Sequence, residues 1–340
     1  MKAVIWTKYG PPDVLELREV EKPLPKDNEL LIKILATTVT AGDCEMRRMD
    51  FPFFLSLPMR LWLGFLNPKE GSIMGTELAG VVEAVGEDVK RFKVGDKVFG
   101  ATGMELGTNA EYVTLPEEAG ETDGGVAILP VNMSYEEAAT VPFGGRDALH
   151  FLRLGHIQPG QKMLINGAGG SIGTFAVQLA KIMGAEVTAV DSTAKLDMLK
   201  SIGADHVVDY TKEDFNKNGV VYDVIFDVVG TVSLADSADS LTPDGAYLLA
   251  NPLRGQILRG PWHRWRSSHR VVMQTASGTV EDLVYLRDLI EAGKLQTVID
   301  RRYPLEEIVE AHRYVETGAK IGNVVITIAH DDIDNKGLEA

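Results

Sequence analysis

The sequence KMLINGAGGSIGTFAVQLAK, residues 162–181, contains the most informative pattern in this chain. An apolar run leads into a glycine-rich turn, and the turn leads into a segment that begins with small residues. Glycines let a backbone turn sharply and approach a pyrophosphate, whose charge is stabilised by unpaired N–H groups and by the dipole of the following helix. The pattern therefore predicts a strand, a phosphate-binding turn and a helix, as in a dinucleotide-binding domain.

The glycine-rich turn departs from the usual motif at one position. It reads Ala168-x-Gly170-x-x-Gly173, with alanine where the first glycine of the usual motif stands. A second apolar run ends at Asp191, about twenty residues beyond the turn, where a ribose-binding acid is expected. This setting favours a nucleotide site over a glycine loop without a ligand. We expect cofactor contacts from the whole turn: Gly167, Ala168, Gly169, Gly170, Ser171, Ile172 and Gly173.

Length and composition limit the alternatives. The chain has 340 residues, more than one hydrophobic core usually serves, so two domains are expected. With 45% apolar and 24% charged residues, it has the composition of an ordinary soluble globular protein. Its 34 Lys and Arg against 49 Asp and Glu give a net charge of -15, which argues against a general affinity for nucleic acid. Cys44 is the only cysteine, which excludes an intrachain disulfide and a cysteine-based structural zinc site.

Two further patterns concern membranes and location. The chain begins MKAVIW, without the longer apolar core of a signal peptide, so we expect a cytoplasmic protein. Residues 51–66 form the longest apolar stretch, but Pro52, Pro58 and Arg60 interrupt it, and a membrane-spanning helix needs about twenty residues. We expect no spanning helix and, at most, peripheral membrane contact.

The pattern along the chain changes once, near Ser134. Residues 1–129 show short alternating runs between turn residues, which predict a small antiparallel barrel or sandwich. Ser134-x-x-Glu137 is typical of a capping box that opens a helix, and helices and strands alternate from there. The strands are expected at Lys162, Glu186, His206, Asp223, Ala246 and Arg270. Six strands so spaced predict an α/β fold with a doubly wound parallel sheet.

The sequence pattern of the C-terminal part predicts helices over residues 281–292 and 305–317 and a last strand over 323–328. A barrel-type first domain needs a closing strand, so we expect this tail to return to it. The last ten residues are polar and acidic and are expected to fray.

Five motifs stand out along the chain: the N-terminal MKAVxxxxYG, residues 75–86 (GTELAGVVEAVG), 94–100 (VGDKVFG), 110–113 (AEYV) and 167–178 (GAGGSIGTFAVQ). Together they resemble motifs of the medium-chain dehydrogenase/reductase superfamily, in particular of its zinc-independent quinone oxidoreductase group. The resemblance implies a GroES-like β-barrel substrate domain made of residues 1–132 and 277–340. It also implies a Rossmann NAD(P)-binding domain over residues 133–276, an active site where the two meet, and a homodimer formed through the edge strand near residues 270–275.

The zinc ligands of the superfamily's alcohol dehydrogenases are absent. Where those enzymes carry Cys-x-x-Asp this chain has Thr40-Ala-Gly-Asp43, and where they carry Gly-His-Glu it has Gly75-Thr76-Glu77. A site rebuilt from Cys44, Glu77 and a histidine would need three placed ligands, and no third is visible. We therefore expect no metal, and Cys44 as a small buried side chain.

Without a metal, a hydride must go to a carbon that is already electrophilic, or hydrogen-bond donors must stabilise the charge that develops on oxygen. The resemblance implies NAD(P)H-dependent reduction of a small lipophilic quinone or α,β-unsaturated carbonyl. It places the catalytic groups at Thr40, Asp43, Asn109 and Tyr112. Tyr112 could donate a proton or pack as a half-buried strand residue. Two alternatives stay open: an alcohol or aldehyde dehydrogenase, and a non-catalytic NAD(P)-binding sensor or scaffold.

Residues near Asp191 give two opposed signals on the cofactor. A carboxylate at this place accepts from the ribose hydroxyls of NAD and repels the phosphate of NADP. The resembling reductases, however, hold that phosphate with residues at the places of Ser192, Thr193, Lys195 and Tyr210, so family usage favours NADP. The other contacts that the resemblance implies are Asp227, Val229, Gly230, Asn251, Pro252 and Asn323.

Two stretches have unusual compositions. Residues 51–66 are too apolar for an ordinary surface connection, so they form either a wall or lid for a lipophilic substrate or a packed interface. Residues 254–270 interleave five arginines with tryptophan and histidine. Such a segment can bind phosphate or a membrane surface, or form ion pairs with acidic neighbours. The net negative charge of the chain argues against binding to nucleic acid.

Overall fold

The structure of this chain is a computed structural model that describes residues 1–51, 53–118, 123–230, 232, 234–250 and 269–330. The chain forms two compact units. Unit 1 comprises Met1–Pro142, Thr279–Glu291 and Ile299–Ala340, and unit 2 comprises Phe143–Gly278 and Ala292–Val298. The domain boundaries expected from the sequence, after residues 132 and 276, lie before the changes of unit that follow Pro142 and Gly278. The unit changes twice more, after Glu291 and after Val298.

Unit 2 contains a parallel sheet of six described strands in the order β10-β9-β8-β11-β12-β13. The order reverses between β8 and β11, which makes this a doubly wound sheet with a switch point at that place. The strands are β8 (Lys162–Asn166), β9 (Glu186–Asp191), β10 (His206–Asp209), β11 (Tyr222–Asp227), β12 (Leu241–Leu249) and β13 (Arg270–Met273). Each of the six strands expected from the sequence is present.

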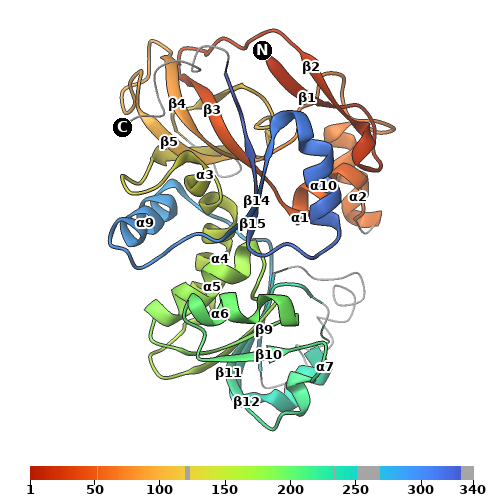
Figure 1. The fold of residues 1–340 in the computed structure, drawn as a ribbon, viewed down its shortest axis with the longest axis vertical. Coiled ribbons are helices and arrows are strands. Elements are labelled where there is room, and N and C mark those ends of the chain that lie inside the picture. The colour runs from red at the N-terminus through yellow and green to blue at the C-terminus, as the bar shows by residue number, and fades with distance from the viewer. Residues whose placement is uncertain (52, 119–122, 231, 233, 251–268, 331–340) are drawn as a thin grey trace. The chain divides into compact units, whose positions relative to one another are not determined.

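The central strands of this sheet are apolar because both of their faces are covered. Leu164, Ile165, Ile225 and Phe226 have no exposed surface, as expected for strands between two layers of helices. Figure 1 shows α5 and α6 beside these strands. The described helices of this part of the chain are α4 (Val141–Gly155), α5 (Ser171–Ile182), α6 (Leu196–Ser201) and α7 (Leu234–Ser237).

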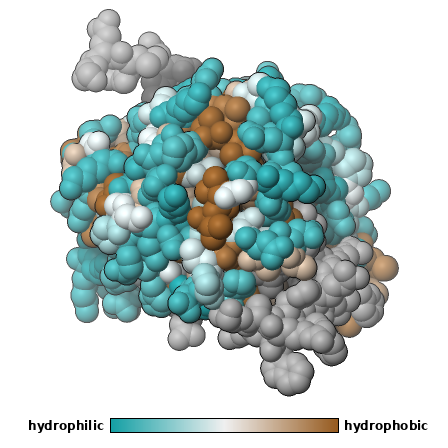
Figure 2. Space-filling model, turned by 90° about the horizontal axis from the view of Figure 1, so that it is seen from below, coloured by the Kyte–Doolittle hydropathy of each residue, from teal (hydrophilic) through white to brown (hydrophobic). Residues whose placement is uncertain are grey.

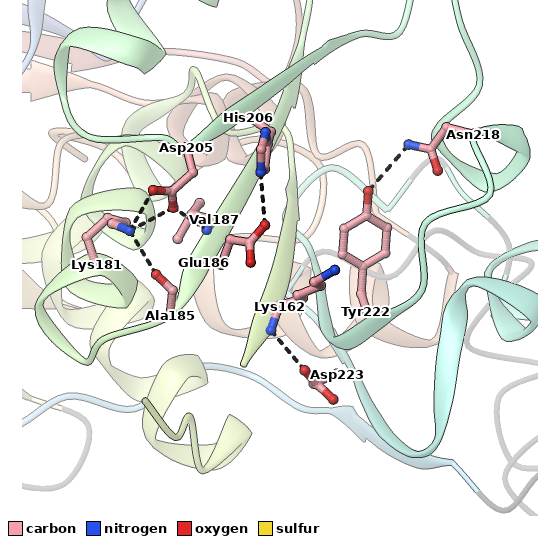
Figure 3. A network of polar contacts seen from close by, with 10 residues as sticks. All are labelled: Lys162, Lys181, Ala185, Glu186, Val187, Asp205, His206, Asn218, Tyr222 and Asp223. Atoms are coloured by element: carbon pink, nitrogen blue, oxygen red, sulfur yellow. Dashed lines mark hydrogen bonds and ion pairs between the residues drawn. The ribbon is translucent and has the colours of Figure 1, made fainter. Parts of the chain in front are cut away.

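Hydrogen bonds and ion pairs surround the amino ends of the strands of this sheet, as Figure 3 shows. Lys181 Nζ lies 2.7 Å from Asp205 Oδ2 and also donates to the Ala185 carbonyl oxygen. Asp205 accepts the Val187 N–H, and Asp223 accepts the Lys162 N–H. Since these groups serve the amino ends of the strands, the opposite, carboxyl ends are where a ligand is expected.

Unit 1 is built on a sheet with the order β14-β15-β3-β4-β5-β7, in which β6 pairs with β3. All these pairs are antiparallel except β14 with β15. A separate hairpin pairs β1 (Lys2–Trp6) with β2 (Leu15–Glu19). The other strands are β3 (Glu29–Val39), β4 (Glu77–Val85), β5 (Lys97–Gly103), β6 (Tyr112–Pro116), β7 (Asp123–Ile128), β14 (Ile299–Pro304) and β15 (Asn323–Thr327).

The helices of unit 1 pack on this sheet. Ser134 and Glu137 form the expected capping box before the short helix α3 (Tyr135–Ala138). The expected C-terminal helices are present as α9 (Val280–Glu291) and as α10 (Ile308–Glu316), which follows a 3-10 turn. Helix α10 buries Ile308, Ala311 and Val315 in the same core as residues of β3 and β15. The other described α-helices of unit 1 are α1 (Ala41–Arg48) and α2 (Phe53–Leu63).

The surface is mostly hydrophilic on the face seen from below, where Figure 2 shows hydrophobic residues gathered mainly through the middle. A group of exposed apolar side chains lies on α2 and the turn after it: Leu57, Leu61, Trp62, Phe65 and Leu66. Leu57 and Leu61 are four residues apart and therefore lie on the same side of the helix. Within the described residues, no helix is both long enough and apolar enough to cross a membrane.

Candidate functional site

The glycine-rich turn lies between the end of β8 and the start of α5. The N–H groups of Gly167 and Ala168 both donate to the Val190 carbonyl oxygen, at 3.0 and 3.1 Å, so the turn is fastened to β9. Helix α5 begins after Gly170, and no side chain caps it among the described residues. The first N–H groups of a helix have no partner inside it, and the helix dipole favours an anion there. All seven residues expected in the turn thus lie at this helix start, where an anion would be favoured.

The glycines of the turn have distinct steric roles. A Cβ atom on Gly173 would lie 2.4 Å from the Gly167 carbonyl oxygen, so only glycine allows the helix to pack this closely on the turn. A Cβ on Gly170 would meet only the Gly167 carbonyl oxygen among the described residues outside its neighbours, at 3.6 Å. The protein therefore leaves open space beside Gly170. This backbone cradle fits a pyrophosphate.

Asp191, at the end of β9, is bonded to the turn. Its Oδ2 accepts the Gly169 N–H at 2.8 Å. Its Oδ1 accepts the Ser192 N–H at 2.8 Å and lies 3.1 Å from Lys195 Nζ. The structure therefore brings together the phosphate turn, the expected ribose acid and the expected phosphate-binding lysine.

A second acid–lysine pair stands at the end of the neighbouring strand β10, where the sequence analysis did not expect one. Asp209 is in register with Asp191 and lies 2.9 Å from Lys212 Nζ. Thr193 also donates to Asp209, and hydrogen bonds from Thr193, Thr211 and Lys212 hold the pKa of Asp209 below its ordinary range. Tyr210 follows and is largely exposed. A carboxylate one residue before Tyr210 was the signal that could have revealed this pair.

Asp227, at the end of β11, is fully buried, and both of its carboxylate oxygens accept hydrogen bonds. Its Oδ1 accepts from Asn166 Nδ2 at 2.9 Å and from the Gly230 N–H at 2.8 Å, and its Oδ2 accepts from the Tyr247 hydroxyl at 2.9 Å. Burial, and then this carboxylate, raise the pKa of Tyr247 above its ordinary range. Asp227 therefore holds the turn that carries Val229 and Gly230, rather than presenting its own oxygens at the surface.

Thr40 and Asp43 form the capping box that opens α1 in unit 1. Thr40 Oγ1 and the Thr40 N–H both donate to Asp43 Oδ2, at 2.6 and 2.8 Å, and the Asp43 N–H donates back to Thr40 Oγ1. Burial raises the pKa of Asp43, and the hydrogen bonds from Thr40 oppose this effect. The two expected catalytic residues thus satisfy each other as a helix cap.

Asn109 lies in a buried polar cluster near the far end of β3. Thr37 Oγ1 donates to the Glu77 carbonyl oxygen at 2.7 Å and lies 2.9 Å from Thr108 Oγ1. The Asn109 side chain is only 1% exposed, and neither its Nδ2 nor its Oδ1 has a hydrogen-bond partner among the described residues. A Cβ on Gly75 would lie 2.5 Å from Asn109 Oδ1, so glycine makes room for this amide. An unpartnered buried amide requires an explanation, and a bound ligand is one.

Tyr112 lies in different surroundings. It is in register with Lys33, four residues before Thr37 on β3, which is about 13 Å along the strand. Lys22 Nζ lies 3.7 Å from the centre of its ring, and the His330 ring contacts it edge-on. Burial, and then the Glu83 carboxylate, raise the pKa of Tyr112, so its hydroxyl stays protonated at neutral pH. The structure does not group Tyr112 with Asn109.

Asn323 begins β15 and is buried beside the end of β3, because its neighbour Val324 pairs with Val39. Asn251 and Pro252 lie outside the described residues. So do most of residues 254–270, of which Arg270 is described and donates to the Gly155 carbonyl oxygen at 2.7 Å.

A buried contact that no sequence pattern predicted joins α1 to α10. Cys44 Sγ lies 3.4 Å from His312 Nδ1, although the two residues are 268 positions apart. Burial raises the pKa of Cys44 to about 12, and burial followed by the nearby Arg47 lowers the pKa of His312 to about 3. Cys44 is thus a small buried side chain, as expected. In the part of the chain that the structure describes, no three His, Cys, Asp or Glu side chains form a group able to hold a metal ion.

Comparisons with known proteins agree on one family. Family models match for the alcohol dehydrogenase GroES-like domain over residues 26–121 and for the zinc-binding dehydrogenase over residues 202–326. A 2-methylene-furan-3-one reductase from Solanum lycopersicum is 34% identical, covering 96% of this chain and 79% of that protein.

Two solved structures have the same fold. The quinone oxidoreductase from Coxiella burnetii has a TM-score of 0.85 at 28% identity, covering 97% of this chain and 99% of that one. The quinone oxidoreductase of Escherichia coli, solved in complex with NADPH, has a TM-score of 0.80 at 26% identity, covering 96% of this chain and 100% of that one.

Proposed function

The chain belongs to the medium-chain dehydrogenase/reductase superfamily, in its quinone oxidoreductase-like group, and on this premise we propose that it reduces a quinone or an α,β-unsaturated carbonyl with NAD(P)H. The observation that carries the proposal is the phosphate cradle at Gly167–Gly173, whose open side at Gly170 and uncapped helix start fit a pyrophosphate. Bound NAD(P)H supplies the hydride. Relatives with this fold are named for quinone and enone reduction.

We propose that the reaction needs no metal. Thr40 and Thr76 stand where the resembling zinc enzymes have ligands, and the Thr40 hydroxyl is already bonded to Asp43. Hydrogen-bond donors must then stabilise the negative charge that develops on the substrate oxygen. Asn109 is our choice for this donor, because its buried amide has no partner in the described part of the chain. A quinone product can take its proton from solvent.

The cofactor preference is proposed as NADP(H). The relative from Escherichia coli was solved with NADPH, and Thr193 and Lys195 lie at the carboxyl end of β9 beside the phosphate turn. We also propose a homodimer through β13, the last strand in the described order, which light scattering on the purified protein would measure. A cytoplasmic location stays a prediction for cell fractionation.

Steady-state oxidation of NADPH and NADH with a panel of quinones and enones tests the function. We expect turnover with activated acceptors, unchanged after treatment with a chelator, and no oxidation of simple alcohols. Absence of turnover with every acceptor, together with zinc in the purified protein, would contradict the proposal. Ethanol oxidation that a chelator abolishes would instead support the alcohol dehydrogenase alternative.

A further inference from the structure

We propose that Asp147 on α4 faces the nicotinamide half of the cofactor site, where its carboxylate binds the oxidised, positively charged ring more tightly than the reduced, neutral ring. This inference rests on the proposed function and adds a residue to the same site. No motif in the sequence marks Asp147, which is a single acid inside a helix.

Asp147 lies at the carboxyl edge of the parallel sheet of unit 2. Residues three and four apart on a helix are neighbours. Three residues before Asp147, Gly144 packs on the start of α5, where a Cβ on Gly144 would lie 2.8 Å from the Ser171 carbonyl oxygen. Three residues after Asp147, His150 Nε2 lies 3.0 Å from Gln274 Nε2, in the segment that follows β13. Asp147 therefore lies between the start of α5 and this segment, and all of these residues belong to unit 2.

A third contact places Asp147 on the other side of the switch point from Asp191. Four residues after Asp147, the centre of the Phe151 ring lies 5.2 Å from that of Phe226, the next-to-last residue of β11. In the sheet, β9 with Asp191 lies on one side of the switch point, and β11, β12 and β13 lie on the other. A dinucleotide binds across such a switch point, so its two nucleotides lie on opposite sides. Since the ribose acid Asp191 marks the adenosine side, Asp147 lies on the nicotinamide side.

The carboxyl group of Asp147 is partly buried and makes no hydrogen bond to the described residues. Burial raises the pKa of Asp147 to about 7, and the positive charge of Arg146 opposes this rise only in part. The groups that contact this part of α4 from α5 and from the segment after β13 carry no charge: Ser171, Gln274 and Ser277. An acid without a partner costs the fold stability, so a ligand of opposite charge explains its presence better than packing does.

Hydride transfer changes the charge of the ligand at this place. Bound NAD(P)H supplies a hydride to the acceptor carbon, after which its nicotinamide ring carries one positive charge, and the product takes its proton from solvent. A carboxylate beside the ring attracts the oxidised form and has little effect on the neutral, reduced form. By linkage, the oxidised cofactor also lowers the pKa of Asp147, because a nearby positive charge favours the ionised carboxyl group. Asp147 thereby favours donation of the hydride.

Dissociation constants of the oxidised and reduced cofactor test this role without requiring turnover. They are measured by calorimetric titration of the full-length protein at pH 6 and pH 8, with whichever of the NADP and NAD pairs binds more tightly. In wild-type protein, we expect the preference for the oxidised form to rise by about fivefold from pH 6 to pH 8, as Asp147 ionises. Asp147→Asn should lose this rise. At pH 8 it should weaken the oxidised cofactor by about tenfold and leave the reduced cofactor within about twofold.

Two variants serve as matched controls. Asp244→Asn removes an exposed carboxylate near the start of β12, and it should leave both dissociation constants and their pH dependence unchanged. His150→Gln removes the titratable neighbour of Asp147 on α4, and it should keep the rise with pH.

A wild-type preference that is the same at pH 6 and pH 8, or an Asp147→Asn variant that keeps the rise, would overturn the inference. If Asp147→Asn does not fold, the titrations of wild-type protein and of His150→Gln decide. Wild-type protein with the expected preference that reduces no acceptor would contradict the proposed function and not this assignment. Turnover without the preference would contradict this assignment and not the proposed function.

Discussion

At the scale of single residues, the structure separates side chains that maintain the fold from those left available for chemistry. Thr40 and Asp43 cap α1, and the carboxylate of Asp227 accepts three hydrogen bonds from the protein itself. Asn109 differs, since both polar atoms of its buried amide lack partners among the described residues. A buried amide without partners costs stability, so its presence is better explained by a ligand than by the fold.

Asn109→Ala should therefore separate activity from stability. We expect kcat/KM for the best acceptor to fall by about a hundredfold, as for loss of one donor to a developing oxyanion. The melting temperature should stay the same or rise, because the buried amide has no described partner to lose. Asn28→Ala, at an exposed position of unit 1, is the matched control and should change neither quantity. Full activity in Asn109→Ala would remove Asn109 from the mechanism.

At the scale of elements, the packing of α1 against α10 places a neutral histidine in the core. The pKa of His312 in the folded protein is about 3, against 6.5 for the ordinary group, because burial and then Arg47 disfavour its charged form. The unfolded chain binds a proton below about pH 6.5 and the folded protein does not. Stability from this residue is thus complete above that pH and is lost as the pH falls toward 3.

Chemical denaturation at several pH values tests this effect. Between pH 6.5 and 4, we expect His312 to remove up to about 1.4 kcal/mol of unfolding free energy for each pH unit. His312→Gln lacks the titrating group, so its unfolding free energy should fall less steeply over the same range. Parallel curves for the two proteins would show that His312 is protonated in the fold.

Elements also show what the sequence could and could not predict. The strands β8 to β13 were predictable because buried parallel strands are continuous apolar runs, and the phosphate turn because glycine spacing is set by sterics. Strand β14 was missed, since its sequence IDRRYP is charged and ends in proline, as suits the end of a sheet. The Cys44–His312 contact joins two helices that are far apart in the sequence, so no local sequence pattern predicts it.

At the scale of the whole molecule, the residues singled out for function divide between the two units. Unit 2 carries the phosphate turn and the two acid–lysine pairs, and unit 1 carries Asn109 and the Thr40–Asp43 cap. The sequence indicated this division through its change from alternating runs to alternating helices and strands. It could not indicate which polar side chains the fold itself would use, because that depends on contacts such as Tyr247 with Asp227.

The central claim is direct hydride transfer from the reduced cofactor to an activated carbon. The most direct measurement uses NADPH carrying deuterium at the nicotinamide C4, on either face in separate reactions, with an enone as acceptor and mass spectrometry of the product. We predict that one labelled face delivers deuterium to the β-carbon of the product, in protein freed of metal by a chelator. A product without deuterium from either face, or transfer that requires added zinc, would contradict the account.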